Sequence, residues 1–310
     1  MPSVIFGVNT CFAVKRWPEP DEWSRLLAEM GVTHAQFSFD LADPMLVGDP
    51  AIYAETRRAC EASGVSITSA FTGLIPYSQN LLGHPSTPVR GRAMDWYRSA
   101  IDATAVLGGS AVGGHIGALT VRQYRDLPDR RRGIRRIVDG VRELADHAAV
   151  RRLECLLWEI MPVAREYPAA LEECEELMVR LEGETAVPIA LCLDMGHACA
   201  AGAEGADRDP YAWLERLGRF TQVVHVQQTD GIGDRHWPFT AEFNAQGIVD
   251  PARVVDLVGG FDRPSVEIVL EAMSAFEADD DSVLADVRES VRYWQPALQR
   301  LSGTGGRAER

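Results

Sequence analysis

The sequence is poor in positive charge, and above all in lysine. Its 310 residues include 31 lysines and arginines against 45 aspartates and glutamates, which gives a formal net charge of −14. Lys15 is the only lysine. A surface of this sign repels phosphate backbones, so a nucleic acid is not an expected partner. Schiff-base chemistry would depend on Lys15 alone and is not expected either.

Paired cysteines and long apolar runs are also missing. The six cysteines are scattered without a CxxC pair, which is typical of reduced, mostly buried thiols. No apolar run approaches the roughly 20 residues of a membrane span. The first residues lack the basic and then apolar pattern of a signal peptide. We therefore expect a cytoplasmic protein with no membrane partner.

Nucleotide and serine-hydrolase motifs are absent as well. The glycine-rich segment 108–114, GGSAVGG, precedes and enters a predicted strand, whereas a dinucleotide fingerprint follows a strand and opens a helix. The sequence contains neither a Walker motif nor a GxSxG elbow. The sequence therefore gives no support for nucleotide binding or for serine hydrolysis.

What the sequence does contain is a regular alternation of short apolar segments with longer amphipathic ones. The predicted strands are 4–8, 34–39, 66–71, 110–116, 155–160, 188–194, 222–227 and 266–272. The predicted helices are 19–30, 51–63, 88–107, 121–148, 169–182, 250–258 and 281–301. Strands that alternate with helices indicate a parallel sheet, and eight units in a chain of this length favour a closed barrel. We predict an α/β fold, a single (β/α)8 TIM barrel over residues 1–301, followed by a disordered tail at 302–310.

Polar residues stand at the ends of the predicted strands, where the active site of such a barrel lies. They are His115, Glu159, Asp194, His197, His225 and Glu271. Burying a charge without a partner is costly, so these positions need an explanation. A set of two glutamates, an aspartate and a histidine suits one divalent ion: Mn²⁺, Mg²⁺ or Co²⁺, with Zn²⁺ also possible.

Each of these residues also has a purely structural interpretation. Glu159 could cap the following helix or pair with Arg165, and Asp194 could be a turn residue. A lone histidine is more often a hydrogen-bonded core residue than a ligand.

Glu271 competes with Glu267, which points to the same side of the strand. We favour Glu271 because it lies at the C-terminal end. A chance gathering of four suitable residues on four strand ends is much harder to explain than any one of them.

Four segments resemble the xylose-isomerase-like TIM-barrel superfamily of sugar and sugar-phosphate isomerases and epimerases. They are LLWEIMPVAREYP (156–168), LCLDMGH (191–197), HVQQTDG (225–231) and VEIVLEA (266–272). The resemblance extends from the first strand to the last helix. The combination of MPVAREYP with QQTDGIGDRHWPFT is most similar to the erythrulose-phosphate epimerases.

The resemblance implies roles for particular residues. Glu159, Asp194, His225 and Glu271 would hold the metal ion, and Glu159 and Glu271 would also move protons. His197 and Arg235 would contact the substrate. Further substrate-binding candidates are His115, Gln227, His236 and Arg165. Arg165 could instead pair with Glu166 or Glu159, and Asp230 and Asp234 could belong to a solvated loop.

Endonuclease IV belongs to the same superfamily, and three segments are similar to it: YSQNLLGHP (77–85), GGHIG (113–117) and DRH (234–236). However, Leu74 stands where that family has a histidine three residues before the tyrosine, here Tyr77. The missing ligand argues against a trinuclear zinc cluster, and with the acidic charge it argues against DNA cleavage.

We therefore expect a metal-dependent isomerase or epimerase of a ketose or ketose phosphate, with a tetrulose phosphate among the candidates. The reaction would pass through a metal-stabilised cis-enediolate. A lyase or dehydratase, including a C-glycoside deglycosidase-like enzyme, is the enzymatic alternative. A phosphodiesterase similar to endonuclease IV and a non-catalytic sugar sensor are less favoured. Related barrels often form homo-oligomers, so a second copy of the chain is a possible partner.

Overall fold

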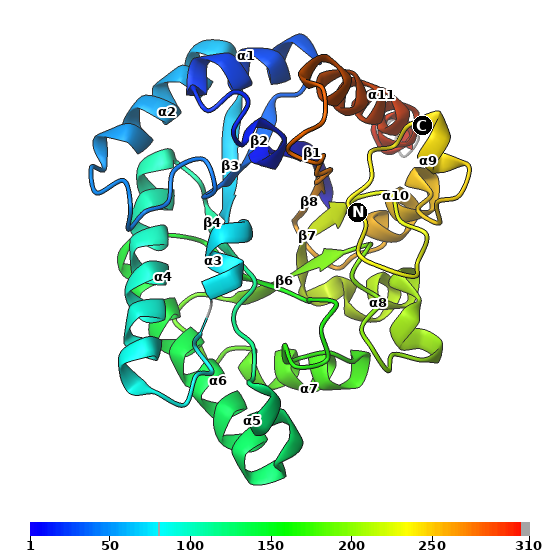
Figure 1. Cartoon of the computed structure of the whole chain (residues 1–310). Helices are drawn as coiled ribbons and strands as arrows, with labels where there is room; N and C mark the ends of the chain where they lie inside the picture. Colours follow the sequence, from blue (N-terminus) through cyan, green and yellow to red (C-terminus); the bar gives the residue numbers. More distant parts are fainter. Residues whose placement is uncertain (80, 305–310) are drawn as a thin grey trace, which may run out of the picture.

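The computed structural model describes residues 1–79 and 81–304. In these residues, eight parallel strands close into a barrel in sequence order (Figure 1). The strands are β1 (Ser3–Asn9), β2 (His34–Ser38), β3 (Ser66–Phe71), β4 (Ala111–Gly114), β5 (Cys155–Glu159), β6 (Ile189–Asp194), β7 (Thr221–Val226) and β8 (Ser265–Leu270). β8 pairs with β1 and so closes the sheet. The predicted TIM barrel is confirmed, and every predicted strand overlaps an observed one.

The long helices surround the barrel as an outer layer, whereas the short helix α3 lies inside this ring (Figure 1). The helices are α1 (Pro20–Glu29), α2 (Ala51–Ser63), α3 (Leu74–Gln79), α4 (Thr87–Leu107), α5 (Val121–Arg125), α6 (Leu127–Val150), α7 (Leu171–Leu181), α8 (Pro210–Leu217), α9 (Ala241–Asn244), α10 (Pro251–Gly259) and α11 (Asp280–Thr304), with the short 3₁₀ helices η1 (Thr10–Ala13), η2 (Gly205–Arg208) and η3 (Gly218–Phe220).

The single helix predicted over 121–148 is in fact two helices, α5 and α6. Asp126 lies between them in an extended conformation, and its side chain accepts a hydrogen bond from the backbone N–H of Asp129. This is the geometry of an N-cap, so α6 begins anew at this point. Three short helices, α3, α8 and α9, were not predicted; they have six, eight and four residues, too few for a clear helical period.

One buried apolar cluster on the strands consists of Phe71, Ala111, Cys155, Leu157, Ala190, Cys192, Val223 and Val269. Side chains along a strand alternate between its two faces. Cys192 and Asp194, two residues apart on β6, therefore point to the same side. The apolar cluster thus forms the floor on which the polar strand ends are placed.

At its C-terminal end the chain continues in helix beyond the predicted barrel domain. α11 extends to Thr304, and the rest of the predicted tail, 305–310, lies outside the described residues. No helix in the described part of the chain is both long and apolar enough to cross a membrane.

Candidate active site and metal centre

Four buried residues converge at the C-terminal end of the barrel. Glu159 ends β5, Asp194 ends β6, His225 lies near the end of β7, and Glu271 directly follows β8. Each offers a ligand atom within 4.8 Å of the others. The structure therefore brings the four predicted metal ligands together from four consecutive strands.

The Nδ1 atom of His225 lies among the three carboxylates. It is 2.9 Å from Oε2 of Glu271, 3.4 Å from Oε1 of Glu159 and 3.8 Å from Oδ2 of Asp194. Nδ1 of His225 and Oδ2 of Asp194 are both buried without a hydrogen bond to any described residue. Buried polar atoms normally have partners. A cation between these two atoms would accept a lone pair from each, so the residues fit a divalent ion with oxygen and imidazole ligands.

Burial and nearby charges shift the pKa values of Asp194, His225 and Glu271. Burial raises the pKa of Asp194 although the nearby His197 lowers it. Burial alone would lower the pKa of His225, but the carboxylates of Glu271 and Glu159 outweigh it and raise the pKa well above its ordinary value. For Glu271, burial acts to raise the pKa, but the charge of His225 prevails and the pKa is lowered. The raised pKa of His225 and the lowered pKa of Glu271 both show that positive charge is favoured next to the carboxylates.

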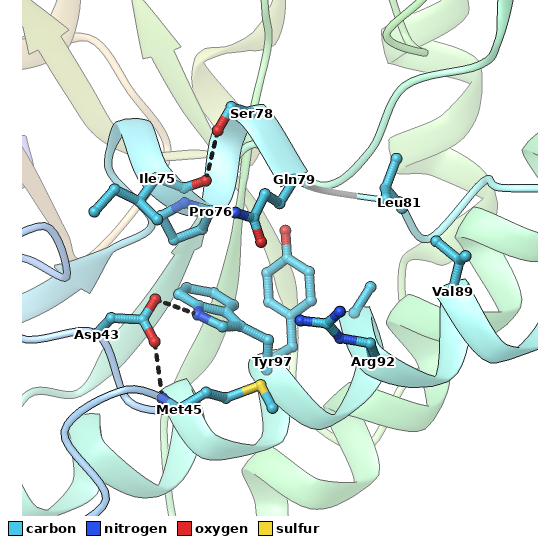
Figure 2. A pocket seen from close by; sticks show the side chains of 12 residues that line it. Asp43, Met45, Ile75, Pro76, Ser78, Gln79, Leu81, Val89, Arg92 and Tyr97 are labelled. Atoms are coloured by element: carbon cyan, nitrogen blue, oxygen red, sulfur yellow. Dashed lines mark hydrogen bonds between the residues drawn. The ribbon is translucent and has the colours of Figure 1, made fainter.

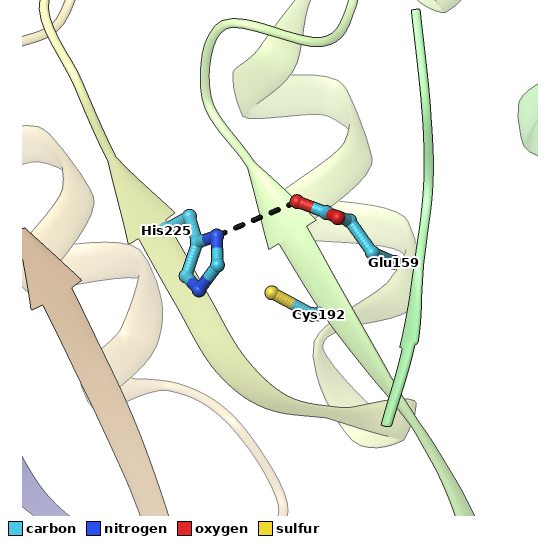
Figure 3. Close-up of side chains that lie close together, drawn as sticks. All are labelled: Glu159, Cys192 and His225. Atoms are coloured by element: carbon cyan, nitrogen blue, oxygen red, sulfur yellow. Dashed lines mark ion pairs between the residues drawn. The ribbon is translucent and has the colours of Figure 1, made fainter. Parts of the chain in front are cut away.

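Cys192 lies immediately beneath these ligands, a position that the sequence analysis did not single out. Figure 3 shows its thiol beside the facing side chains of Glu159 and His225, and the three form a second possible ligand group. Burial raises the pKa of Cys192 to about 12. A thiol with such a pKa is neutral near pH 7, so in this state it belongs with the apolar floor.

A second polar cluster, formed by His197, Gln227, Asp234 and His236, lies next to the four proposed ligands. Asp234 and His236 belong to the loop between β7 and α9. Asp234 lies 3.4 Å from Nε2 of His197 and 3.1 Å from Nε2 of His236. Gln227 donates hydrogen bonds to Asp194 (2.9 Å) and to Asp234 (2.8 Å), and so links the two clusters. His197 and His236 also form a possible ligand group with Asp194.

The charge of Asp234 governs this second cluster. Burial acts to raise its pKa, but hydrogen bonds from His197 and His236 prevail and hold the pKa below its ordinary value. Burial acts to lower the pKa of His236, whereas Asp234 and Glu271 raise it to about 9. His197, His236 and Gln227, all predicted to bind substrate, are thus gathered around Asp234. Of the interpretations open for Asp234, the solvated loop does not describe these contacts.

The cavity at the strand ends is bordered by residues of both clusters, whereas Asp194, His225 and Gln227 are not among the residues that line it. It is lined by Phe71, Thr72, Gly73, Leu74, Tyr77, His115, Glu159, Met161, His197, Asp234, His236, Glu271 and Met273. His115, another predicted substrate-binding residue, lies on its wall with Nε2 3.2 Å from Glu166. Tyr77 packs against His115, and its hydroxyl donates to Glu166 at 3.4 Å.

The two predicted arginines do not line this cavity. Arg235 is bound through its guanidinium to Asp230, with Nη2 2.8 Å from Oδ2. Arg165 donates from Nη1 to the carbonyl oxygen of Leu119 at 2.6 Å. A role of either arginine in substrate binding therefore stays a prediction.

A larger cavity lies away from the strand ends, between α3, α4 and the segment after β2 (Figure 2). Trp96 donates to Asp43 at 2.8 Å on its wall. None of the predicted site residues lines it. α3 borders both cavities: Leu74 and Tyr77 face the strand ends, whereas Ile75 and Pro76 line the larger cavity.

Comparison with known proteins agrees with this fold. The family model of the xylose isomerase-like TIM barrel matches residues 24–271. The D-erythrulose 1-phosphate 3-epimerase of Brucella abortus (strain 2308) is 30% identical over 302 residues, which cover 96% of this chain and 97% of that protein.

Two solved structures are similar as well. A protein of Rhodospirillum rubrum ATCC 11170, provisionally described as a xylose isomerase, is 32% identical with a TM-score of 0.88, over 95% of this chain and 99% of that one. The D-psicose 3-epimerase of Clostridium cellulolyticum H10, solved with D-tagatose, has a TM-score of 0.67 at 15% identity, over 96% of this chain and 97% of that one. The second likeness supports the fold alone.

The chain belongs to the xylose isomerase-like TIM-barrel family. The predicted family is thereby confirmed, and so is the prediction of an enzyme of the sugar isomerase and epimerase class.

Proposed function

We propose that the protein is a divalent-metal-dependent epimerase of a ketose or ketose phosphate, with a tetrulose phosphate as the first candidate. The observation that carries the proposal is the convergence of three carboxylates on Nδ1 of His225 at the mouth of the barrel. The relative that is 30% identical over 96% of the chain acts, by its name, on a tetrulose phosphate.

Glu159, Asp194, His225 and Glu271 would hold the metal ion. When bound, such an ion polarises a carbonyl group and stabilises the negative charge that develops as the neighbouring carbon loses its proton. A carbon acid next to a ketone is weak, so a carboxylate is a sufficient base only with this help.

Glu159 and Glu271 would move the proton. Glu159 ends β5 and Glu271 directly follows β8, so that β6 and β7 lie between them in the barrel, and both line the cavity. A substrate between them would expose one face to each carboxylate. If one takes the proton and the other returns it to the opposite face of the same carbon, the product is an epimer. Return of the proton to the adjacent carbon, together with transfer of a hydroxyl proton to the former carbonyl oxygen, would instead give aldose–ketose isomerisation.

The second cluster would orient the hydroxyl groups of the substrate. Nδ1 of His197 lies 2.8 Å from the carbonyl oxygen of Ile160 and donates to it, so Nε2 faces the cavity and Asp234. His236 is held on the other side of the same carboxylate. Imidazoles fixed in this way can bind hydroxyl oxygens without a large loss of side-chain freedom.

The test is product analysis in D₂O with tetrulose, pentulose and hexulose phosphates and their unphosphorylated forms. An epimerase yields a product of unchanged skeleton that carries one deuterium on the inverted carbon. We expect Glu159→Gln to lower kcat by about 10²–10⁴-fold, the usual contribution of a general acid or base. Glu143→Gln, a change of an exposed glutamate paired with Arg98 on the outer surface, is the control and should leave kcat unchanged.

Two outcomes would contradict the proposal. A product that has lost water or a carbon–carbon bond would indicate a lyase. Turnover without deuterium on carbon would exclude a proton transfer at carbon.

A further inference from the structure

A chain of hydrogen bonds connects Asn9 and Gln36 to His225, one of the four proposed ligands. One backbone amide determines which atom donates and which accepts in each of these bonds. The backbone N–H of Cys11 donates to the side chain of Asn9 at 2.9 Å. A backbone N–H is always a donor. The Asn9 atom that it contacts must therefore be the amide oxygen, and this determines which way the Asn9 amide points.

The amide nitrogen of Asn9 consequently faces the barrel interior. It donates to Oε1 of Gln36 at 2.8 Å and to Oε1 of Glu271 at 3.0 Å. Because Asn9 presents a donor, the Gln36 atom opposite it must be an acceptor. The Gln36 amide is oriented in turn: its nitrogen donates to Oγ of Ser69 at 3.1 Å, and the Ser69 hydroxyl reaches the buried carboxylate of Glu267 at 3.4 Å.

The same Gln36 oxygen lies 2.7 Å from Nε2 of His225. An oxygen on one side of this contact requires a proton on the other, so Nε2 of His225 carries hydrogen. In a neutral imidazole the lone pair is then on Nδ1, which is the atom among the three carboxylates. With either amide reversed, two donors would face each other in this buried site.

We propose that Asn9 and Gln36 are positioning residues that hold His225 in the Nε2–H form and so present Nδ1 to the metal ion. Asn9 also holds Glu271, so one side chain aligns two of the four ligands. The assignment of the proton rests on hydrogen bonds alone, whereas its effect on metal affinity rests on the proposed function. Partners of this kind typically change metal affinity by about 10–100-fold.

The experiment uses the zinc-loaded protein labelled with ¹⁵N-histidine, because zinc is diamagnetic. The His225 signals are identified by their loss in His225→Ala. In the wild type, we expect the ¹⁵N shifts to show zinc on Nδ1 and a slowly exchanging proton on Nε2. Zinc affinity is measured in parallel by competition with a chelator. Both readouts are independent of any substrate, so they stand even if the proposed reaction is wrong.

Three variants test the cause. Gln36→Leu removes the acceptor and should weaken zinc binding by about 10–100-fold, with loss of the slowly exchanging Nε2 proton. Gln36→Glu keeps an acceptor at the same position and should retain the signal. Gln123→Leu is the matched control: Gln123 is also buried and doubly hydrogen-bonded, but lies in the capping box of α5, and its loss should change neither readout.

Zinc bound to Nε2 of His225 in the wild type would overturn the proposal. This outcome needs no variant, so the proposal can be tested even if Gln36→Leu does not fold. Retention of both the proton signal and the zinc affinity in a folded Gln36→Leu protein would overturn it too.

Discussion

The carboxylate of Glu271 and the imidazole of His225 face each other, with 2.9 Å between Oε2 and Nδ1. β7 and β8 are paired in parallel up to Leu270. Glu271 is the next residue, and its backbone N–H donates to the carbonyl oxygen of Val226 at 3.0 Å, so the edge of the sheet fixes the position of its backbone. Ligands held by strands are already in place before an ion arrives, which favours a site of defined geometry.

Metal content gives the first prediction. We expect about one divalent ion per chain by inductively coupled plasma mass spectrometry, and no bound ion in His225→Ala, because this change removes a ligand itself and should exceed the roughly 10–100-fold effect of an outer partner. Two or three zinc ions per chain would instead point to hydrolysis. A protein that takes up no metal would contradict the proposed mechanism.

Asp234→Asn should impair catalysis more than folding. The change removes the charge shared by His197 and His236, and hydrogen bonds to charged groups contribute about 1.5–3 kcal/mol. We therefore expect kcat/KM to fall by about tenfold or more, whereas the chain should still fold, with a melting temperature lowered by a few degrees for each kcal/mol lost. Asp230→Asn is a control in the same loop, since Asp230 pairs with Arg235 outside the cavity. An equal loss in both variants would show a general effect of the loop.

Two glycine substitutions should have opposite effects on stability. A Cβ at Gly113 on β4 would lie 1.9 Å from the backbone oxygen of Leu157 on β5. Gly113→Ala must therefore separate two strands, and we expect a loss of about 3 kcal/mol or more. A Cβ at Gly91 in α4 would meet no atom within 4 Å, so Gly91→Ala should stabilise the chain by about 0.5–1 kcal/mol. Urea unfolding measures both.

The buried carboxylate of Glu267 predicts a dependence of stability on pH. Burial raises its pKa although Thr68 and Ser69 lower it by hydrogen bonding. The folded chain thus holds this proton more tightly than the unfolded chain, so the contribution of Glu267 is favourable below its unfolded pKa and is lost as the pH rises through the folded value. Glu267→Gln removes this loss while keeping an oxygen for Ser69.

The unfolding free energy of Glu267→Gln relative to wild type should therefore increase between pH 4 and the neutral range. The direct check is urea unfolding of both proteins at several pH values. A difference that does not vary with pH would show that Glu267 has the same pKa in both states.

The barrel could be predicted from the sequence because its strands are buried on both faces and read as apolar runs. The same regularity predicted that Glu159, Asp194, His225 and Glu271 gather at one place, since they interrupt those runs near their ends, and the structure brings them together. Asn9, which directly follows the predicted strand 4–8, is also a polar residue at the end of an apolar run, but it was not predicted to belong to the site. Gln36 was a polar residue inside a buried strand and was also open to prediction.

Other features could not be inferred from local sequence. Arg235 and Asp234 are neighbours in the loop after β7, yet only Asp234 lines the cavity, because Arg235 is bound to Asp230. Such side-chain directions depend on partners that become neighbours only when the loop folds. The short helix α3 was missed for a similar reason: Asp40 on another segment accepts hydrogen bonds from its first backbone amides, those of Leu74 and Ile75.

The position of α3 has a consequence for redesign. Its two faces belong to two separate cavities, with Leu74 and Tyr77 on the inner side and Ile75 and Pro76 on the outer side. Because α3 lines both cavities, a change of side-chain volume on its outer side would also shift its inner side. A library of substitutions at the outer residues would therefore reshape the space available to a substrate while every side chain that faces the substrate keeps its identity.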